Sequence, residues 1–332
     1  MRIVALEEHF TFPELQGRID PALVVKRGYP PPDAPSVRPE IDDRLKDFGA
    51  ARLKSLDDSG ISLQVMGPSG PGADLLPPSE GPAFARELND ALAAQIALQP
   101  NRYAGFAHLP LTAPEAAADE LERCVTKLGF HGCMVNGTTD GKFLDDPMFE
   151  PVLARAEALD VPIYVHPGIP PQAVREAYYG GLKGPLPTIF ARAGYGWHAE
   201  TAVHIIRMAL SGVLDKHPKL QLIIGHQGEG LPAMLDRFEE TFSGAVPKFL
   251  QRHPAQTILE QVHVTTSGFY NLPSFLMLMQ IFGADRIMFS VDYPFSSNDV
   301  ARSFLDSLPL SPADRVKIAH GNADKLLKLK VA

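Results

Sequence analysis

Short apolar runs alternate along the chain with longer segments in which apolar residues recur every three or four positions. The short runs are typical of buried β-strands, and the longer segments are typical of amphipathic helices. Candidate strands lie at residues 2–9, 60–69, 102–111, 129–137, 161–168, 220–228, 262–268 and 285–294. Candidate helices between them include residues 83–95, 113–128 and 199–218. The pattern therefore predicts strands and helices in regular alternation.

Eight alternations of this kind are typical of parallel βα units, and a (β/α)8 barrel closes them into one ring. We predict that residues 1–332 form a single α/β domain of this TIM-barrel type, and an open doubly wound sheet is the alternative. A Rossmann nucleotide site is disfavoured, because no G-x-G-x-x-G follows the first strand and no G-x-x-x-x-G-K-[ST] is present.

Two connections are longer than ordinary loops. Residues 10–39 are rich in proline, and residues 167–198 combine glycine with aromatic residues. Each follows a strand that ends in a histidine. Because long connections in compact domains are often functional, we expect both to be loops that arch over a site at the C-terminal face. Surface decoration or a subunit contact is the alternative.

Composition narrows the class of ligand and the compartment. Charged residues make up 21% of the chain, and the formal net charge of −8 argues against a nucleic-acid surface. Cys124 and Cys133 are the only cysteines, too few for a disulfide framework, which favours a reducing cytosol. Glu7 and Glu8 interrupt any signal-peptide pattern, and no apolar segment approaches the ~20 residues of a membrane span. We expect a cytoplasmic protein whose partners are small molecules.

Ionisable and polar residues gather where the candidate strands end. Catalytic groups of a barrel lie at the C-terminal ends of its strands, so this coincidence indicates a site. The strand-end residues are Glu7, His9, His108, Asn136, His166, His226, Ser267 and Asp292.

The alternation of side chains along a strand predicts which of these residues face inward. In the first strand Glu7 and His9 share a face with Ile3 and Ala5, whereas Glu8 points away with Val4 and Leu6. In the last strand Asp292 points inward with Met288 and Ser290, and in the fifth His166 lies opposite Ile163 and Val165.

Glu7, His9, His166 and Asp292 therefore converge from three strands around one point. Two imidazoles and two carboxylates suit Zn²⁺ or Mn²⁺ better than a soft metal. A single histidine at a strand end is more often hydrogen-bonded in a core, but the coincidence of all four favours one divalent metal ion.

The stretch "GHQGEGLP" indicates a second constellation. Glu229 follows His226 by three residues, close enough to orient the imidazole and raise its basicity. The alternative is that Glu229 only favours a helix N-terminus. Arg237, eight residues after Glu229 on the same expected helical face, could bind an anionic substrate or pair with Asp236 or Glu240.

The sequence resembles the metal-dependent, oxygen-independent benzoate decarboxylases of the amidohydrolase superfamily, the γ-resorcylate and 2,3-dihydroxybenzoate decarboxylases. The stretches that carry the resemblance span nearly the whole chain: "ALEEHF", "RCVTKLGFHGCMVNG", "VPIYVHP", "ETAVHIIRMALSGVLDKHPKLQLIIGHQGEGLP", "VTTSG" and "ADRIMFSVDYPF". Hydrolytic members usually begin with H-x-H. This chain has Glu7 in place of the first histidine, as the decarboxylases do, which favours C–C cleavage over hydrolysis.

The resemblance implies a barrel with one Mn²⁺ or Zn²⁺ ion on Glu7, His9, His166 and Asp292. It implies decarboxylation of an ortho-hydroxylated benzoate to a phenol and CO₂, with Asp292 as proton donor, catalytic roles for His226 and Glu229, and substrate contacts from His226 and Arg237. It also implies a homodimer or homotetramer.

Three alternatives remain open at this stage. The chain could hydrolyse a lactone or an amide with a metal-bound water as the nucleophile. It could decarboxylate a methoxylated aromatic acid, as carboxyvanillate decarboxylases do, or a non-aromatic acid of the aminocarboxymuconate-semialdehyde type, because such decarboxylases share much of the scaffold. It could also be a small-molecule binding protein that has kept the barrel and lost turnover.

Overall fold

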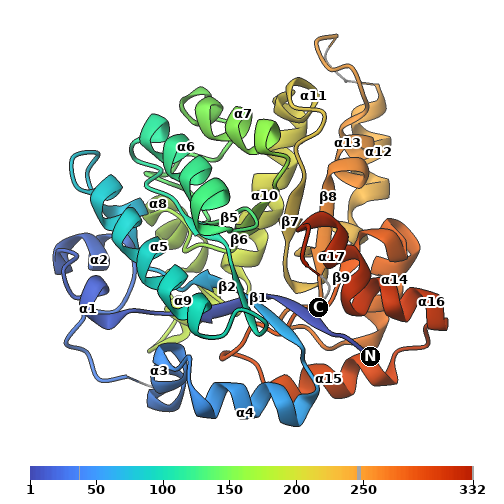
Figure 1. The fold of residues 1–332 in the computed structure, drawn as a ribbon. Coiled ribbons are helices and arrows are strands. Elements are labelled where there is room, and N and C mark those ends of the chain that lie inside the picture. The colour runs from blue at the N-terminus through green and yellow to red at the C-terminus, as the bar shows by residue number, and fades with distance from the viewer. Residues whose placement is uncertain (37, 245–247, 331–332) are drawn as a thin grey trace.

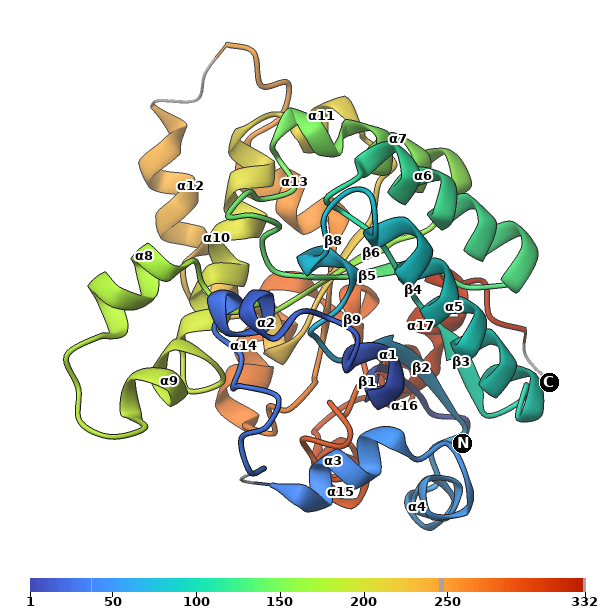
Figure 2. The same cartoon turned by 90° about the vertical axis from the view of Figure 1, so that its left-hand side faces the viewer.

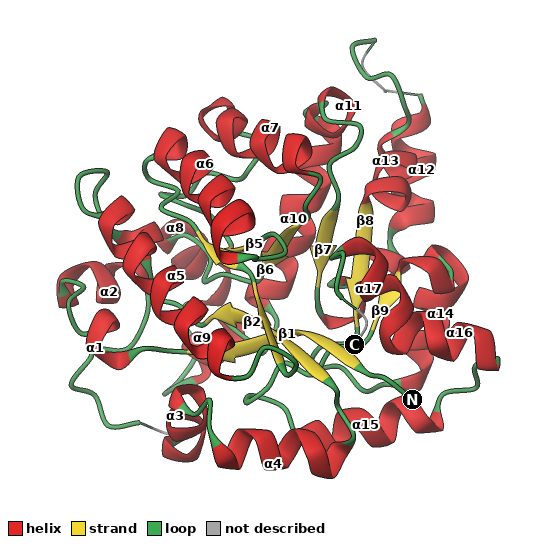
Figure 3. Ribbon diagram, viewed as in Figure 1, coloured by secondary structure: helices red, strands yellow, loops and turns green. Residues whose placement is uncertain are grey.

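The computed structural model describes residues 1–36, 38–244 and 248–330 of the chain, and Figures 1 and 3 show its arrangement of strands and helices. The strands form the centre of the molecule. In chain order they are β1 (Val4–Phe10), β2 (Leu63–Pro68), β3 (Tyr103–Gly105), β4 (Ala107–His108), β5 (Cys133–Asn136), β6 (Ile163–His166), β7 (Leu222–Ile224), β8 (Val262–Thr265) and β9 (Ile287–Met288).

All the strands pair in parallel with their neighbours, in the orders β1-β2-β3 and β4-β5-β6-β7-β8-β9. Only Phe106 separates β3 from β4, and its N–H donates to Met66 O at 2.9 Å, while the next N–H bonds to Gly132 O at 2.8 Å. The two sheets are thus continuous through one interrupted strand. At the other edge His9 N donates to Tyr293 O at 2.7 Å, which brings the segment that follows β9 beside β1. The predicted (β/α)8 barrel is confirmed.

Helices surround the strands (Figure 2). The predicted helix at 83–95 is confirmed as α5, and that at 113–128 as α6 with a following turn of π-helix over Cys124–Leu128. The predicted helix at 199–218 is two helices, α10 and α11, because Gly212 adopts φ 81° between them. The helices are α1 (Pro13–Gln16), α2 (Pro21–Arg27), α3 (Pro39–Lys46), α4 (Ala50–Ser59), α5 (Gly81–Leu98), α6 (Pro114–Arg123), α7 (Glu150–Leu159), α8 (Gln172–Val174), α9 (Leu186–Ala191), α10 (Gly196–Leu210), α11 (Val213–Lys216), α12 (Leu235–Ser243), α13 (Pro254–Gln261), α14 (Leu272–Phe282), α15 (Asn298–Ser307), α16 (Pro312–Val316) and α17 (Asn322–Leu326).

Apolar side chains pack in two buried clusters. The larger cluster lies between strands and helices, and it holds Ile163 and Val165 of β6. The smaller one fills the barrel interior with residues such as Phe106 and Tyr164. Leu327, the residue after α17, also belongs to this cluster. A barrel filled in this way is a packed core rather than a pore. Its site must therefore lie at one end.

The two long connections are not the unstructured loops that the sequence suggested. The first contains α1 and α2, and the second contains α8 and α9. They contact each other: Arg27 Nη1 donates to Ile169 O, and Arg175 Nη2 donates to Lys26 O at 3.2 Å. Both leave the barrel at the C-terminal ends of their strands, β1 and β6. In the part of the chain that the structure describes, no helix is both long and apolar enough to cross a membrane.

His204 is a buried structural histidine on α10. Its Nε2 accepts a hydrogen bond from Leu144 N at 2.9 Å. Burial and the positive charge of Arg207 lower the pKa of His204 to about 3. The imidazole must therefore remain neutral for the native packing to persist at mildly acidic pH.

The pKa of His204 predicts a loss of stability in acid. Because the unfolded chain binds a proton below its ordinary pKa of about 6.5 and the folded chain does not, the free energy of unfolding should fall by about 2 kcal/mol from this group between pH 7 and pH 5. Urea titrations of the wild type and of His204→Gln, which keeps an acceptor but does not titrate, measure the difference. Equal pH dependence of the two proteins would contradict the prediction.

Candidate active site

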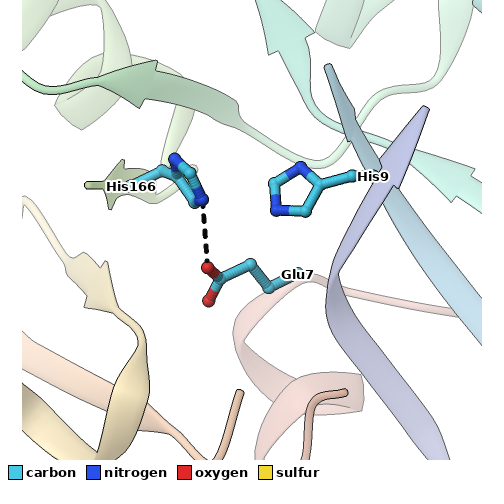
Figure 4. A group of neighbouring side chains, drawn as sticks. All are labelled: Glu7, His9 and His166. Carbon is cyan, nitrogen blue, oxygen red and sulfur yellow. Dashed lines mark ion pairs between the residues drawn. The ribbon is translucent and has the colours of Figure 1, made fainter. Parts of the chain in front are cut away.

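The structure brings together the four residues predicted as metal ligands. Glu7 and His9 project from β1, His166 ends β6, and Asp292 follows β9. Glu7 Oε1 lies 3.2 Å from His166 Nε2, and His9 Nε2 lies 3.3 Å from Asp292 Oδ1. Figure 4 shows the side chains of Glu7, His9 and His166 facing one another, and donor atoms of these three lie within 4.8 Å of one another.

The donor atoms at this point fit a divalent metal ion. Among the described residues, Glu7 Oε1, both ring nitrogens of His9 and Nδ1 of His166 are buried without a hydrogen-bond partner. Leaving such groups unpaired is costly. Two atoms bound at about 2.1 Å to one ion lie roughly 3 to 4 Å apart, which matches the separations of 3.2 and 3.3 Å. Nitrogen and oxygen donors of this kind suit Mn²⁺ or Zn²⁺.

The second oxygen of Glu7 is fully occupied by hydroxyl donors. Tyr164 Oη and Ser267 Oγ both donate to Glu7 Oε2. Burial and the charge of Glu7 raise the pKa of Tyr164 well above its ordinary value, so that the phenol keeps its proton and remains a donor. These bonds hold Oε1 toward His166. Burial raises the pKa of Glu7, but His226, His166 and His9 outweigh it and lower that pKa.

A register shift in β1 explains why Glu7 and His9 face inward although Val4 and Leu6 do so too. The pairing with β2 is irregular between Ala5 and Glu8, and such a bulge places two successive residues against one on the partner strand. The predicted partition of the first strand is therefore wrong for its beginning, where Val4 and Leu6 pack in the barrel interior and Ile3 and Ala5 outside it. The bulge turns Glu7 inward after Leu6.

The other two predicted partitions are confirmed. In the last strand, Met288 lies inside the barrel while Phe289 and Val291 lie outside. Asp292 follows in a left-handed backbone conformation with φ 69°, which costs a non-glycine residue on the order of 1 kcal/mol or more. Tyr164 faces inward between Ile163 and Val165, as the position of His166 required.

His226 and Glu229 form a second buried group beside the first. His226 Nδ1 lies 2.8 Å from Glu229 Oε1, and His226 Nε2 lies 3.7 Å from Glu7 Oε1 and 3.9 Å from Asp292 Oδ2. Burial lowers the pKa of His226, but the charges of Glu229 and Glu7 outweigh it and raise that pKa well above its usual value. His226 and Glu229 both have left-handed backbones, with φ 51° and 56°, a strain that is common at functional sites.

Sequence reasoning missed His198. Its Nδ1 lies 2.6 Å from Glu229 Oε2, and its ring packs edge-on against His226 with centroids 4.6 Å apart. Trp197 Nε1 donates to His198 Nε2 at 3.1 Å. His198 lies in the first turn of α10, at the end of the second long connection, so only its position near a helix start could have singled it out.

The helical-face argument for Arg237 is wrong. Glu229 precedes α12, which begins at Leu235, so the two residues share no helix. Arg237 is exposed and pairs with Glu240 at 2.7 Å. It does line a largely apolar cavity of about 720 Å³ that reaches His198 and Glu229. Its role in substrate binding stays a prediction.

The whole chain is similar to several known decarboxylases. A γ-resorcylate decarboxylase of Rhodococcus jostii is 38% identical over 98% of both chains. The structure of a 2,6-dihydroxybenzoate decarboxylase with 2,6-dihydroxybenzoate superimposes with a TM-score of 0.86 at 36% identity, over 99% of both chains. A dihydroxybenzoic acid decarboxylase of Polaromonas with manganese and the inhibitor 2-nitroresorcinol gives 0.87 at 35% identity, over 99% of this chain and 98% of that one.

The amidohydrolase family model matches residues 9–329, nearly the whole sequence. Together with the barrel and the relatives above, this match shows that the chain belongs to the amidohydrolase family.

Proposed function

We propose that the protein is a metal-dependent decarboxylase that converts an ortho-hydroxylated benzoate of the dihydroxybenzoate type into a phenol and CO₂. The observation that carries the proposal is the convergence of Glu7, His9, His166 and Asp292 with unpaired donor atoms among the described residues. The names of the relatives support the reaction, and the 2,6-dihydroxybenzoate in a related structure supports the substrate class.

We propose that these four residues hold one divalent ion, Mn²⁺ or Zn²⁺. Manganese in the related Polaromonas structure favours Mn²⁺. When bound, the ion supplies Lewis-acid polarisation for the carboxylate and the neighbouring hydroxyl of a substrate. The protein's contribution is the fixed geometry of the donors, which Tyr164 and Ser267 support through Glu7.

Asp292 is the proposed proton carrier. Burial raises the pKa of Asp292, but His226 and His9 outweigh it and lower that pKa. The ionised carboxylate accepts the proton of the substrate's ortho-hydroxyl and delivers it to the ring carbon that carries the carboxylate. Aromaticity is interrupted, the C–C bond to the carboxylate breaks with its electron pair returning to the ring, and CO₂ leaves. The phenolate takes a proton from water.

His226 is the proposed partner of the ring oxygen. Glu229 accepts from the Nδ1 side of His226 and so directs Nε2 toward Glu7 and Asp292. From there Nε2 would hydrogen-bond a ring hydroxyl or its developing negative charge. His198 occupies the other oxygen of Glu229 and restrains the carboxylate.

Assay of the metal-loaded protein with a panel of hydroxylated benzoates tests the reaction. We expect CO₂ and the matching phenol from 2,6- or 2,3-dihydroxybenzoate, together with about one equivalent of Mn²⁺ or Zn²⁺ by elemental analysis. The control Asp292→Asn is nearly isosteric but carries no exchangeable carboxyl proton, so we expect a folded protein that releases no CO₂. Hydrolysis of lactones or amides without CO₂ would overturn the proposal in favour of a metal-dependent hydrolase.

Substitution of His226 tests its role at the substrate. His226→Asn should lower kcat by roughly 10²-fold or more, because it removes a group that handles protons in the transition state. The matched control is His253→Asn, because His253 caps α13 with Nδ1, which accepts from Ala255 N at 3.2 Å, and asparagine caps helices well. Kinetics of His226→Asn equal to those of the control would return His226 to a packing role.

We also propose a homodimer or homotetramer in which a second copy of the chain covers the apolar cavity beside α12. Tyr195, Met234 and Phe269 line it with 57%, 56% and 39% of their surface exposed. Exposed apolar patches of this kind mark contact sites, and a two-fold axis pairs the same patch on both copies.

Light scattering should give twice or four times the chain mass. Met234→Glu, which places a charge on the proposed contact, should shift the mass toward the single chain. Leu98→Glu, a substitution at the C-terminal end of α5 where 70% of the side chain is exposed, should not. A wild-type mass equal to one chain at all concentrations would refute the assembly.

A further inference from the structure

Three polar side chains outside the ligand set are completely buried behind β1. They are Glu8 on β1, Arg52 on α4 and Gln64 on β2, each with 0% of its surface exposed. Arg52 Nε donates to Gln64 Oε1 at 2.8 Å, and Gln64 Nε2 donates to Glu8 Oε2 at 3.0 Å. Burying two charges and an amide is costly unless hydrogen bonds and charge pairing offset the loss of water.

One end of this chain of hydrogen bonds reaches His9. Arg52 Nη1 donates to His9 O at 2.9 Å, and the guanidinium lies over the Tyr293 ring at 4.8 Å from its centroid. The Arg52 side chain therefore fixes the main chain of β1 at the proposed ligand His9.

The other end clamps both sides of Asp292. Glu8 Oε1 accepts from Val291 N at 2.9 Å and from Ser290 Oγ at 3.1 Å, while Glu8 Oε2 accepts from Tyr293 N at 3.3 Å. The residues on either side of Asp292 are thus tied to the one carboxylate. Asp292 itself has φ 69°, and such a conformation persists only when its surroundings hold it.

Where β1 meets the segment that follows β9, a seam of the barrel, side chains take the place of part of the main-chain pairing. Ser290 Oγ accepts from Leu6 N at 3.2 Å and from Glu7 N at 2.7 Å, in addition to its bond to Glu8. Because β1 carries Glu7 and His9 while the β9 side carries Asp292, these contacts set the separation between the two halves of the ligand set. His9 Nε2 and Asp292 Oδ1 lie 3.3 Å apart across the seam.

We propose that Glu8, with Gln64 and Arg52 behind it, is a positioning device that holds Asp292 and His9 at metal-binding separation. Glu8 acts through the backbone on either side of Asp292 and touches neither metal nor substrate. Without it, Asp292 would relax toward an ordinary backbone conformation and its carboxylate would leave the common point. The inference rests on the metal site proposed above.

Glu8→Gln tests the positioning device. The amide nitrogen of the new glutamine is a hydrogen-bond donor, and it would face two other donors, Gln64 Nε2 and Tyr293 N. Outer partners of metal ligands typically contribute 10- to 100-fold in affinity. We expect the Kd of the folded variant for Mn²⁺, measured by calorimetry, to rise at least tenfold, and kcat to fall more than KM changes. The exchange Glu8→Gln/Gln64→Glu restores a donor facing an acceptor and should recover part of the Mn²⁺ affinity.

Glu120→Gln is the matched control for a merely structural effect. Glu120 is also a buried carboxylate, bonded to Asn89 Nδ2 at 2.8 Å and Arg123 Nη2 at 2.7 Å, but it lies on α6 away from the site. We expect it to lower the melting temperature and leave Mn²⁺ affinity unchanged.

The possible outcomes distinguish the positioning device from the proposed metal site. Wild-type Mn²⁺ affinity and kcat in folded Glu8→Gln would overturn the positioning role even if the melting temperature fell. If Glu8→Gln does not fold, Glu8→Asp decides in the same way, because the shorter side chain keeps the charge but withdraws the carboxylate from Val291 N and Tyr293 N. A wild-type protein that binds no Mn²⁺ would overturn both the metal site and the positioning device. Binding of Mn²⁺ without release of CO₂ would overturn only the proposed reaction.

Discussion

The buried carboxylate of Glu7 is the constraint on which the site depends. An isolated charge in a barrel interior is very costly, so the groups that compensate it must arrive together. Tyr164 and Ser267 donate to one oxygen, and the rings of His166 and His226 face the other. These partners come from β6, from the residues after β8 and from those after β7. The site is therefore complete only in the closed barrel.

The first strand serves both sides of the barrel wall. Its bulge turns Glu7 and His9 toward the common point, while Glu8 points outward to Gln64 and to the main chain around Asp292. Burial raises the pKa of Glu8 to about 7, although the Val291 N–H and the charge of Arg52 oppose this effect. Glu7 and His9 share one polar site, whereas Glu8 lies in a separate polar environment on the other side of the strand.

The apolar part of the molecule supplies the rigidity that these charges require. Left-handed backbones at Asp292, His226, Gln227 and Glu229 store strain that only a well-packed surrounding can maintain. The clusters inside and outside the strands provide it. Beside the charged group, the cavity near Phe269 is lined mainly by apolar side chains.

The sequence by itself determined the barrel and most of the candidate site. Alternating strand and helix patterns specify parallel units, and Glu7, His9, His166 and Asp292 could be selected because strand ends in a barrel share one face. Side-chain alternation also gave the correct inner side for Met288 and Tyr164, on which the inward placement of Asp292 and His166 was based, because the residues around them alternate between the two clusters.

Only the tertiary structure decided what depends on contacts between distant segments. The bulge in β1 arises from its pairing with β2, so strict alternation misplaced Val4 and Leu6. His198 and Tyr164 join the site through partners 31 and 157 residues away. Arg237 does not share a helical face with Glu229, because the chain turns before α12 begins. Local patterns encode which face a side chain takes, whereas the partner it meets there is set by closure of the ring.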